Sequence, residues 1–287
     1  MRIDDFQDPS VFLGVATSFL VVEEAVHCIL LGVPADMARF GGNPDARFWV
    51  VTVDRGQVVG AAMWTPPLSL SVSRMSRDGV GALVEHLQKL HLPLPGVRGP
   101  AEEAGWFADA WAVRSAARAE PLGAGEHVWQ LNRTSFIRTN PVAASPDHFG
   151  LPTQQDFATV NAWAPEAAAS FDQTADHWAE DIALASRERQ LYVWREPEPV
   201  AMAMLRGETP SGVRVSGVFT PLAHRRQGYA AALVGAMSEG ALNSGRECCF
   251  LFTDASNATA EGIYARIGYE QVAACQQYRF VAQSDAE

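Results

Sequence analysis

The sequence is poor in cysteine, and its few cysteines are not spaced to hold a metal ion. The 287 residues include four cysteines, none of them in a Cys-x-x-Cys pair. Because structural zinc sites usually contain such pairs, we expect no metal site. Cys248 and Cys249 are adjacent in an apolar run, where neighbours on a strand point to opposite faces. We interpret them, and likewise Cys28 and Cys275, as buried thiols of a protein in a reducing cytoplasm.

Positive charge is also scarce. Lysine and arginine together number 22 against 33 aspartates and glutamates, so the formal net charge is −11 and the pI is near 5.1. Domains that bind nucleic acid usually carry a basic surface, so we expect no nucleic-acid partner. An acidic surface keeps a protein in solution and attracts cationic small molecules, amines among them.

A long uninterrupted hydrophobic run is missing as well. The longest apolar stretch, residues 11–33, is interrupted by Ser18, Glu23, Glu24 and His27, which makes crossing a bilayer costly. The first nine residues are polar and acidic, whereas a secretory leader is basic and then apolar. We therefore expect no membrane partner and a cytoplasmic location.

What the chain does contain is enough material for two domains of ordinary size, since 48% of its residues are hydrophobic. Residues 139–150 hold two prolines, alanines and polar residues with little periodicity, which is typical of a linker. We predict one domain over residues 1–140 and another over residues 148–287. The sequence leaves open whether the protein is a monomer or a homodimer.

Hydrophobic periodicity and turn residues predict the elements of the first half. The expected helices are 11–31, 78–90 and 101–118, and the expected strands are 48–54, 58–64 and 127–132. Asp78 is the expected N-cap of its helix. Residues 91–100, rich in proline and glycine, are expected to form a connection.

The second half shows a similar order of elements. The expected helices are 156–169, 177–186, 228–243 and 258–266, and the expected strands are 190–194, 200–206, 213–219, 248–253, 269–274 and 277–281. Mixed elements with an internal hairpin predict an α+β fold, with a mixed, mostly antiparallel sheet flanked by helices. Since both halves run from helix through a hairpin to further helices and strand, we interpret them as two tandem related domains.

The segment that carries chemistry joins the strand 213–219 to the helix that follows. Its loop contains Arg225 and Arg226, and Gly228 stands at the start of the helix. The first amides of a helix lack intrahelical acceptors and lie at the positive end of its dipole, so they bind anions. Gly228 allows close approach of the backbone, and two arginines suit a diphosphate. Taken alone, this loop motif is also consistent with a basic loop whose only role is to cap the helix.

A second motif follows downstream. The strand that ends at Asp254 is followed by Asn257 and then by Tyr264, Gly268 and Tyr269. The two motifs at this separation resemble the signatures of the GNAT superfamily of N-acetyltransferases. The resemblance implies a GNAT (acyl-CoA N-acyltransferase) fold for the second half, with a degenerate GNAT-like domain before it, and acetyl-CoA as cosubstrate with no metal.

The resemblance also implies roles for individual residues. The strand ending at Val218 would splay from its neighbour and bind the pantetheine arm, with a bulge at Gly217, and the loop amides would hold the pyrophosphate. The implied cofactor-binding residues are Val218, Phe219, Thr220, Arg225, Arg226, Gln227, Gly228, Tyr229, Ala230, Ala231 and Asn257. Tyr264 matches the family tyrosine that faces the thioester sulfur, which makes it the candidate catalytic residue.

The general base stays open. Many members of the family carry a glutamate on the strand before the loop, whereas residues 213–219 here contain no carboxylate. The proton of the amine would leave through water or to His177, Glu180, His224 or Asp254. Asp254 also suits a role as cap of the helix entered at Asn257.

The acceptor pocket of such folds usually involves the first helices of the domain. Here these carry an aromatic and acidic set that would suit a cationic amine: Trp163, Phe171, Asp172, Asp176 and Trp178. The same tryptophans would equally suit a core, and the aspartates helix caps. In the first half, residues 73–79 contain arginines and a glycine without a clean strand-to-helix glycine turn, so we expect that half to bind no cofactor and to help form the acceptor pocket.

The favoured function is transfer of an acetyl group from acetyl-CoA to a primary amine of a small molecule. One alternative is acetylation of a protein N-terminus or lysine. The other is a non-catalytic acyl-CoA sensor, which the missing strand glutamate favours and the presence of Tyr264 disfavours.

Overall fold

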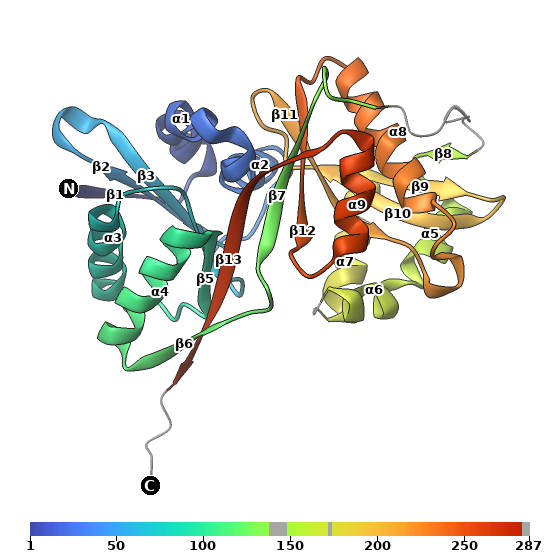
Figure 1. Ribbon diagram of the computed structural model, residues 1–287. Helices are drawn as coiled ribbons and strands as arrows, with labels where there is room; N and C mark the ends of the chain where they lie inside the picture. The colour runs from blue at the N-terminus through green and yellow to red at the C-terminus, as the bar shows by residue number, and fades with distance from the viewer. Residues whose placement is uncertain (138–147, 172–173, 283–287) are drawn as a thin grey trace, which may run out of the picture.

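The fold is built on one continuous sheet of thirteen strands, in a computed structural model that describes residues 1–137, 148–171 and 174–282. The strand order is β1-β2-β3-β4-β5-β13-β7-β12-β11-β10-β9-β8, and β6 pairs with β13 (Figure 1). The strands are β1 (Arg2–Phe6), β2 (Arg47–Thr52), β3 (Val58–Trp64), β4 (Leu70–Val72), β5 (Gly96–Pro100), β6 (Ala117–Pro121), β7 (Glu126–Asn132), β8 (Phe149–Gly150), β9 (Leu191–Arg195), β10 (Pro199–Arg206), β11 (Gly212–Phe219), β12 (Cys248–Asp254) and β13 (Glu270–Ala282). The described pairs β4/β5 and β11/β12 are parallel and the others antiparallel, which confirms a mixed, mostly antiparallel sheet.

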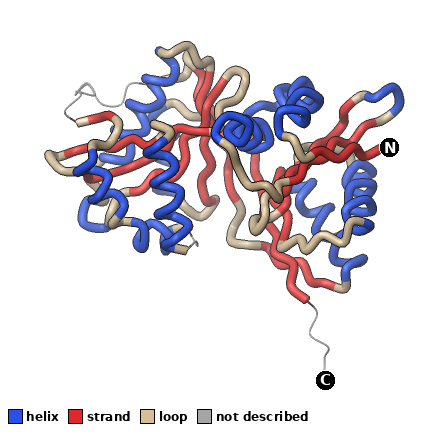
Figure 2. Tube along the Cα trace, turned by 180° about the vertical axis from the view of Figure 1, so that it is seen from behind, coloured by secondary structure: helices blue, strands red, loops and turns tan. Residues whose placement is uncertain are grey.

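Helices flank the sheet in both halves, as the view from behind shows (Figure 2). They are α1 (Pro9–Leu20), α2 (Glu24–Phe40), α3 (Arg77–Lys89), α4 (Ala101–Ser115), α5 (Gln154–Asn161), α6 (Ala164–Ser170), α7 (Ala175–Arg187), α8 (Tyr229–Asn243) and α9 (Ala258–Ile267). The arrangement of helices on two faces of a sheet buries the apolar side of each element.

The two halves repeat one arrangement. Each begins with a strand and helices and continues with strands that pair antiparallel in sequence order. In each, the next pair along the sheet is parallel and encloses a helix, α3 between β4 and β5 and α8 between β11 and β12. This repetition confirms the interpretation of two tandem related domains.

Packing follows the same plan in both halves. In the first half α3 and α4 cover one face through Leu83 and Phe107, while α1 and α2 cover the other through Phe12 and Leu31. In the second half α8 and α9 share one core cluster on one face of the sheet. The helices α5, α6 and α7 form a separate cluster with Leu191 and other residues on the opposite face.

The halves exchange their last strands. β7 of the first half lies beside β12 of the second, and β13 runs past β7 and on along β5 (Figure 1). Cys28 of α2 also packs into the cluster that Phe250 and Cys275 form at this junction. The linker expected near residues 139–150 lies mostly outside the described residues, so the bounds 1–140 and 148–287 stay a prediction. Hydrogen bonding nevertheless runs continuously between the halves.

Several sequence-based boundaries were wrong. The helix expected over 11–31 is two helices separated by a 3₁₀ turn at Val21–Glu23, and the second continues to Phe40. The helix expected over 156–169 is also two helices, and Pro165 is in the first turn of the second, which begins at Ala164. The N-cap of α3 is Ser76 rather than Asp78, since the Ser76 hydroxyl accepts the Gly79 N–H at 3.2 Å.

Other errors concern strands. The connection expected over 91–100 contains β5, and the two strands expected over 269–281 are the single strand β13. The glycines of β5 made its sequence resemble a loop. These glycines are needed because the neighbouring strands lie too close for a side chain. A Cβ on Gly96 would lie 2.1 Å from the carbonyl oxygen of Tyr278 on β13.

The helical run Pro9–Phe40 is long and apolar enough, by length and composition alone, to cross a membrane. Core helices pass the same test, and here Phe12, Leu20 and Leu31 of this run are buried against the sheet. The expected absence of a membrane partner stays a prediction.

Candidate active site

The site begins where β11 and β12 part. The two strands pair only from Gly212 to Arg214, opposite Cys248 to Phe250. Next along β11, the register with β10 shifts because Met202 pairs with Phe219 while Met204 pairs with Ser216. Two parallel strands that stop pairing leave an opening between their C-terminal ends, and ligands of α/β sheets bind at such openings.

Gly217 allows the bulge that the register shift records. Its φ of +60° is in the left-handed region, and a Cβ there would lie 3.2 Å from the Trp178 ring. A side chain at this position would be both strained and crowded. The bulge expected at Gly217 is therefore present, next to Val218 and Phe219 on the strand.

The helix α8 opens toward solvent at its N-terminus. Gly228 is its N-cap, with a φ of +88°, and no side chain caps the helix. The amides of Tyr229, Ala230 and Ala231 therefore lack both an intrahelical acceptor and a side-chain cap. A Cβ on Gly228 would meet no heavy atom within 4 Å, so the space before these amides is open. The amides and the helix dipole together form a site for an anion.

The loop separates its two arginines. The Nε of Arg225 donates to the Thr220 carbonyl at 2.9 Å, and its guanidinium lies 3.7 Å from Glu166 and over the Phe219 ring. Arg226 is exposed, and no hydrogen bond or ion pair ties its side chain to any described residue. Arg225 thus shapes the loop, whereas Arg226 is available to an anion. Gln227 accepts the Tyr229 hydroxyl at 3.0 Å.

Thr220 fits a ligand in this opening. Its hydroxyl is buried and makes no hydrogen bond with the described residues. A buried hydroxyl without a partner is costly unless a bound group completes it. The orphaned hydroxyl at the end of β11 and the uncapped start of α8 both fit the pantetheine-diphosphate portion of acetyl-CoA.

Tyr264 lies on α9, on the face of the sheet that α8 also covers. It is 7% exposed and packs edge-on against Tyr269, with ring centroids 6.0 Å apart. Burial raises the pKa of the Tyr264 hydroxyl to about 12, so the group is protonated at neutral pH. It is therefore in the right state to donate a proton to a leaving thiolate.

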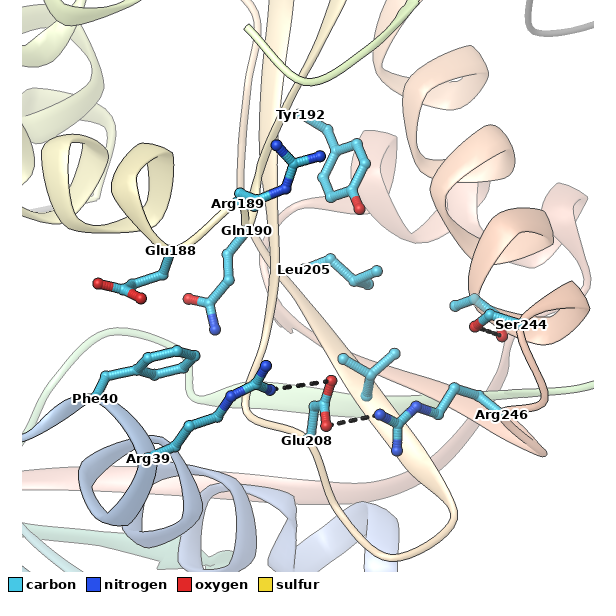
Figure 3. A pocket seen from close by; sticks show the side chains of 12 residues that line it. Arg39, Phe40, Glu188, Arg189, Gln190, Tyr192, Leu205, Glu208, Ser244 and Arg246 are labelled. Carbon is cyan, nitrogen blue, oxygen red and sulfur yellow. Dashed lines mark hydrogen bonds and ion pairs between the residues drawn. The ribbon is translucent and has the colours of Figure 1, made fainter.

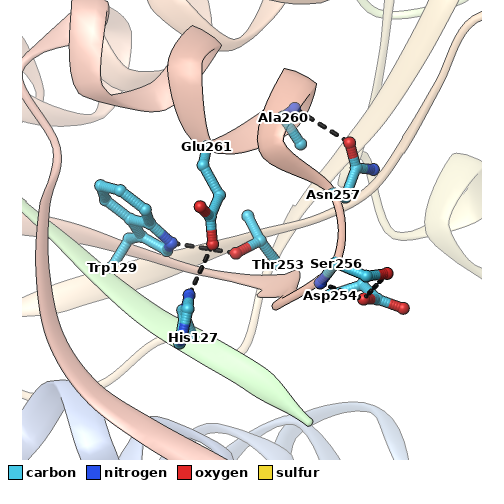
Figure 4. Close-up of polar contacts among 8 residues, drawn as sticks. All are labelled: His127, Trp129, Thr253, Asp254, Ser256, Asn257, Ala260 and Glu261. Carbon is cyan, nitrogen blue, oxygen red and sulfur yellow. Dashed lines mark hydrogen bonds and ion pairs between the residues drawn. The ribbon is translucent and has the colours of Figure 1, made fainter. Parts of the chain in front are cut away.

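The start of α9 accounts for two predicted residues. The Asn257 side chain accepts the Ala260 N–H at 3.0 Å, so it caps the helix (Figure 4). Asp254 instead accepts the N–H and hydroxyl of Ser256 in the preceding turn. These hydrogen bonds lower the pKa of Asp254, which stays ionised. The expectation that Asp254 caps this helix was wrong.

The contacts of the described residues single out no general base among the four candidates. His177 and Glu180 are exposed on α7, and His224 is half-buried in the turn before α8. Among the described residues, no hydrogen bond or ion pair joins these side chains or Asp254 to Tyr264. The base stays open.

The aromatic set of the first helices gathers at the end of β11. Trp178 is 4% exposed and belongs to the core, while Phe171 is 40% exposed and its ring is tilted against that of Trp178, with centroids 4.9 Å apart. Trp163 is half-buried, 6.2 Å from the Phe219 ring. Asp176 is exposed in the first turn of α7, and Asp172 lies outside the described residues.

Two polar contacts near the site were not predicted from the sequence. His127 of β7 lies 2.5 Å from Glu261 of α9, one turn before Tyr264, and the Trp129 indole donates to Thr253 at 3.0 Å (Figure 4). A strand of the first half thus anchors the helix that carries Tyr264. No local sequence pattern indicates these contacts, because they depend on the exchange of strands between the halves.

A separate cavity of about 360 Å³ lies at the other end of α8 (Figure 3). Arg39 and Arg246 both bind Glu208 there, at 3.9 and 2.6 Å. The 15 residues of α8 place it ~22 Å from Gly228. Since α2 and α8 both end there, these arginines offset the negative ends of helix dipoles. The cavity is a charged junction of the halves and lies outside the candidate active site.

Comparison with known proteins agrees with this geometry. The family model described as "Acetyltransferase (GNAT) family" matches residues 156–269. Comparison with curated proteins finds no significant match.

Solved structures resemble the whole chain. An acetyltransferase from the GNAT family of Colwellia psychrerythraea has a TM-score of 0.58 and 14% identity, covering 98% of this chain and 100% of that one. A GCN5-related N-acetyltransferase from Sphaerobacter thermophilus has a TM-score of 0.59 and 15% identity, covering 100% and 98%.

A tandem GNAT protein from the clavulanic acid biosynthesis pathway has a TM-score of 0.58 and 14% identity, covering 99% of this chain and 100% of that one. At such identities the likeness shows the fold, and here it extends over both halves. Residues 156–269 therefore match the GNAT family of acetyltransferases, within a chain that has the tandem GNAT fold.

Proposed function

We propose that this protein transfers the acetyl group of acetyl-CoA to a primary amine of a small molecule. The observation that carries the proposal is the uncapped N-terminus of α8 at Gly228, placed directly after the opening between β11 and β12. The amides of α8 and the side chain of Arg226 would bind the diphosphate. The Thr220 hydroxyl and the backbone of Val218 and Phe219 would bind the pantetheine arm.

The reaction needs few groups. The neutral amine attacks the thioester carbonyl carbon, a C–N bond forms, the C–S bond breaks, and coenzyme A leaves as a thiolate. A strand amide beside the bulge at Gly217 would stabilise the carbonyl oxygen, typically worth about 3 kcal/mol. Tyr264 would give its proton to the thiolate, and the proton lost by the amine restores the balance.

The surroundings of β11 favour a small acceptor. On the face opposite α8, α7 packs against the strand from one half and α2 closes over the β10–β11 turn from the other. A Cβ on Gly32 of α2 would lie 2.5 Å from the Gly207 carbonyl oxygen, so this contact is tight. This contact lies at the start of β11, whereas α7 packs at the end of the strand, where Trp178 and Phe219 share one core cluster. We take this packing beside the acceptor to favour a compact molecule over a protein chain.

Release of free thiol from acetyl-CoA, with a panel of amines, amino acids, polyamines and aminoglycosides, tests the proposal. We expect amine-dependent release that Gly228→Trp abolishes, because the side chain would occupy the space before the α8 amides. Gly56→Trp is the matched control, since Gly56 also has a positive φ, +75°, and an open Cβ position. Amine-independent release, or equal loss in both variants, would contradict the proposal.

Tyr264→Phe tests the chemical step separately. We expect kcat to fall by about 100-fold, the usual size of a general-acid contribution, while the Kd for acetyl-CoA is unchanged. A protein that binds acetyl-CoA normally and releases no thiol with any amine would instead be a sensor.

A further inference from the structure

The loop between β11 and α8 is held from outside by one side chain of α6. The carboxylate of Glu166 accepts the Leu222 N–H at 2.7 Å and lies 3.7 Å from the Arg225 guanidinium. Among residues 1–137, 148–171 and 174–282, no other side chain from outside residues 220–229 makes a hydrogen bond or ion pair with them. In the described structure, Glu166 is therefore the polar anchor of the loop that would bind the diphosphate.

The contacts inside the loop leave it in need of an anchor. The Pro221 carbonyl accepts the His224 N–H at 2.8 Å, and the Thr220 carbonyl accepts the Nε of Arg225 at 2.9 Å. These bonds close a single 3₁₀ turn at Leu222–His224 and join it to no neighbouring helix or strand. The Leu222 side chain is 72% exposed, so apolar packing contributes little to holding the turn.

The helix α6 is a firm base for this anchor. Ala164, Ala167 and Ala168 are each at most 3% exposed and share one core cluster with Trp178 of α7. Trp163, the N-cap of α6, lies 6.2 Å from the Phe219 ring at the end of β11. The same short helix thus contacts the strand just before the loop and, through Glu166, the loop itself.

The charge of Glu166 argues for a geometric role. A carboxylate beside an anion site repels the anion, so electrostatics alone would disfavour it there. Arg225 offsets this charge and also packs over the Phe219 ring, which leaves Arg226 to face the anion. A loop that is already fixed loses less conformational entropy when its ligand binds. Holding the loop in place explains the presence of an acid at this position.

We infer that Glu166 is a positioning residue of the cofactor site, which holds the loop in the conformation that binds the diphosphate without itself touching acetyl-CoA. Thr220 and Gly228 stand at the two ends of the loop. An anchor at Leu222 therefore sets where the pantetheine and diphosphate contacts lie relative to each other. The inference rests on the proposed function and adds to it a residue of α6.

Two substitutions of Glu166 separate position from charge. Glu166→Gln removes the charge but keeps an oxygen that can accept the Leu222 N–H, whereas Glu166→Ala removes both. Calorimetry should give a Kd for acetyl-CoA about 10-fold higher in Glu166→Ala, the usual effect of losing one hydrogen bond to a charged group. The Kd of Glu166→Gln should be unchanged or lower. Glu85→Ala is the control, because Glu85 is also an exposed helical acid paired with a basic side chain, Lys89.

An acetyl donor without the diphosphate tests whether the effect is confined to the loop. S-acetylpantetheine carries the thioester and the pantetheine arm alone. With one amine as acceptor, Glu166→Ala should lower kcat/KM for acetyl-CoA by about 10-fold and leave kcat/KM for S-acetylpantetheine unchanged. The melting temperature should change little, because exposed ion pairs contribute little to stability.

The outcomes are distinguishable. An unchanged Kd in Glu166→Ala overturns the inference and leaves the transferase intact. A shift of the same sign and size in Glu166→Gln and Glu166→Ala assigns the effect to charge and also overturns it. Parallel losses with both acetyl donors, or a marked fall in melting temperature, assign Glu166 a structural role. If the unsubstituted protein binds acetyl-CoA and turns over no amine, the proposed function fails while the calorimetric comparison still decides the inference.

Discussion

The two halves of the molecule share one fold and differ at the start of a single helix. In the first half the loop from β4 to α3 is short, and Ser76 caps the helix by accepting the Gly79 N–H. In the second half the loop from β11 to α8 is longer, and the cap is Gly228, which has no side chain. The serine hydroxyl occupies one of the first amides of its helix, whereas a glycine leaves all of them to an anion.

The strands that flank these loops differ in the same sense. β4 and β5 are parallel like β11 and β12. They stay in contact, however, at the position where β11 and β12 separate to form the opening. A Cβ on Gly99 would lie 2.6 Å from the Val72 carbonyl oxygen. The Arg74 N–H in this loop is bound by the buried His27. The first half has therefore kept the fold and closed the opening, which supports the proposal that it binds no cofactor.

Separating the halves should have the largest effect. Residues 148–287 alone would lack β7, which pairs with β12 over seven residues and also flanks β13. We expect this fragment to be unfolded or aggregated, because both neighbouring strands would expose their edges. Circular dichroism and thermal unfolding measure this, with the full chain as reference.

A fragment that unfolds cooperatively and turns over acetyl-CoA would show that the strand exchange is dispensable. Adding residues 1–147 as a separate chain should restore folding, since it supplies β7. This complementation distinguishes the loss of one strand from general damage by truncation.

Acetyl-CoA should bind once per chain. Calorimetry on the full protein should give a stoichiometry of one, and Gly228→Trp should remove all measurable binding by blocking α8. The affinity should fall by at least about 100-fold, as expected for loss of several charge-assisted hydrogen bonds. Binding by this variant at the affinity of the unsubstituted protein would mean that the first half also holds a cofactor and that Ser76 does not close it.

Features set by neighbouring residues could be predicted from the sequence, and those set by distant strands could not. Gly228 and Tyr264 stand in short motifs whose spacing reports a local strand, turn and helix. By contrast, β5 contains Gly96 and Pro100 and resembles a loop, because its glycine is required by β13, far along the chain. The pairing of His127 with Glu261 likewise depends on which strands and helices become neighbours.

The stability of the first half should depend on pH through His27. Its Nδ1 donates to the Leu20 carbonyl at 2.9 Å and its Nε2 accepts the Arg74 N–H at 3.1 Å, so the ring is held neutral. Burial lowers its pKa in the folded state, with opposing contributions from the Leu20 carbonyl and Glu23. The unfolded chain then binds more protons in mildly acidic solution.

The neutral His27 ring therefore contributes its full stabilisation above the pKa of the unfolded state, about 6.5. This stabilisation is lost as the pH falls below that value. Urea unfolding at pH 7.5 and pH 5.5 should show a decrease in the free energy of unfolding that is smaller in His27→Gln. His91→Gln is the control, since His91 is exposed on the surface. An identical decrease in all three proteins would assign the pH dependence to other groups.

The smallest expected effect comes from the cap that distinguishes the halves. Ser76→Ala removes the side-chain acceptor of α3 and should lower the free energy of unfolding by about 1 kcal/mol, the typical cost of a lost N-cap. The affinity for acetyl-CoA and its stoichiometry should not change, because the closed contact of Gly99 with Val72 still blocks the opening. A second acetyl-CoA bound by Ser76→Ala would show that this one serine is enough to prevent the first half from binding the cofactor. Unchanged binding would show that the closed strands prevent cofactor binding in the first half even without the cap.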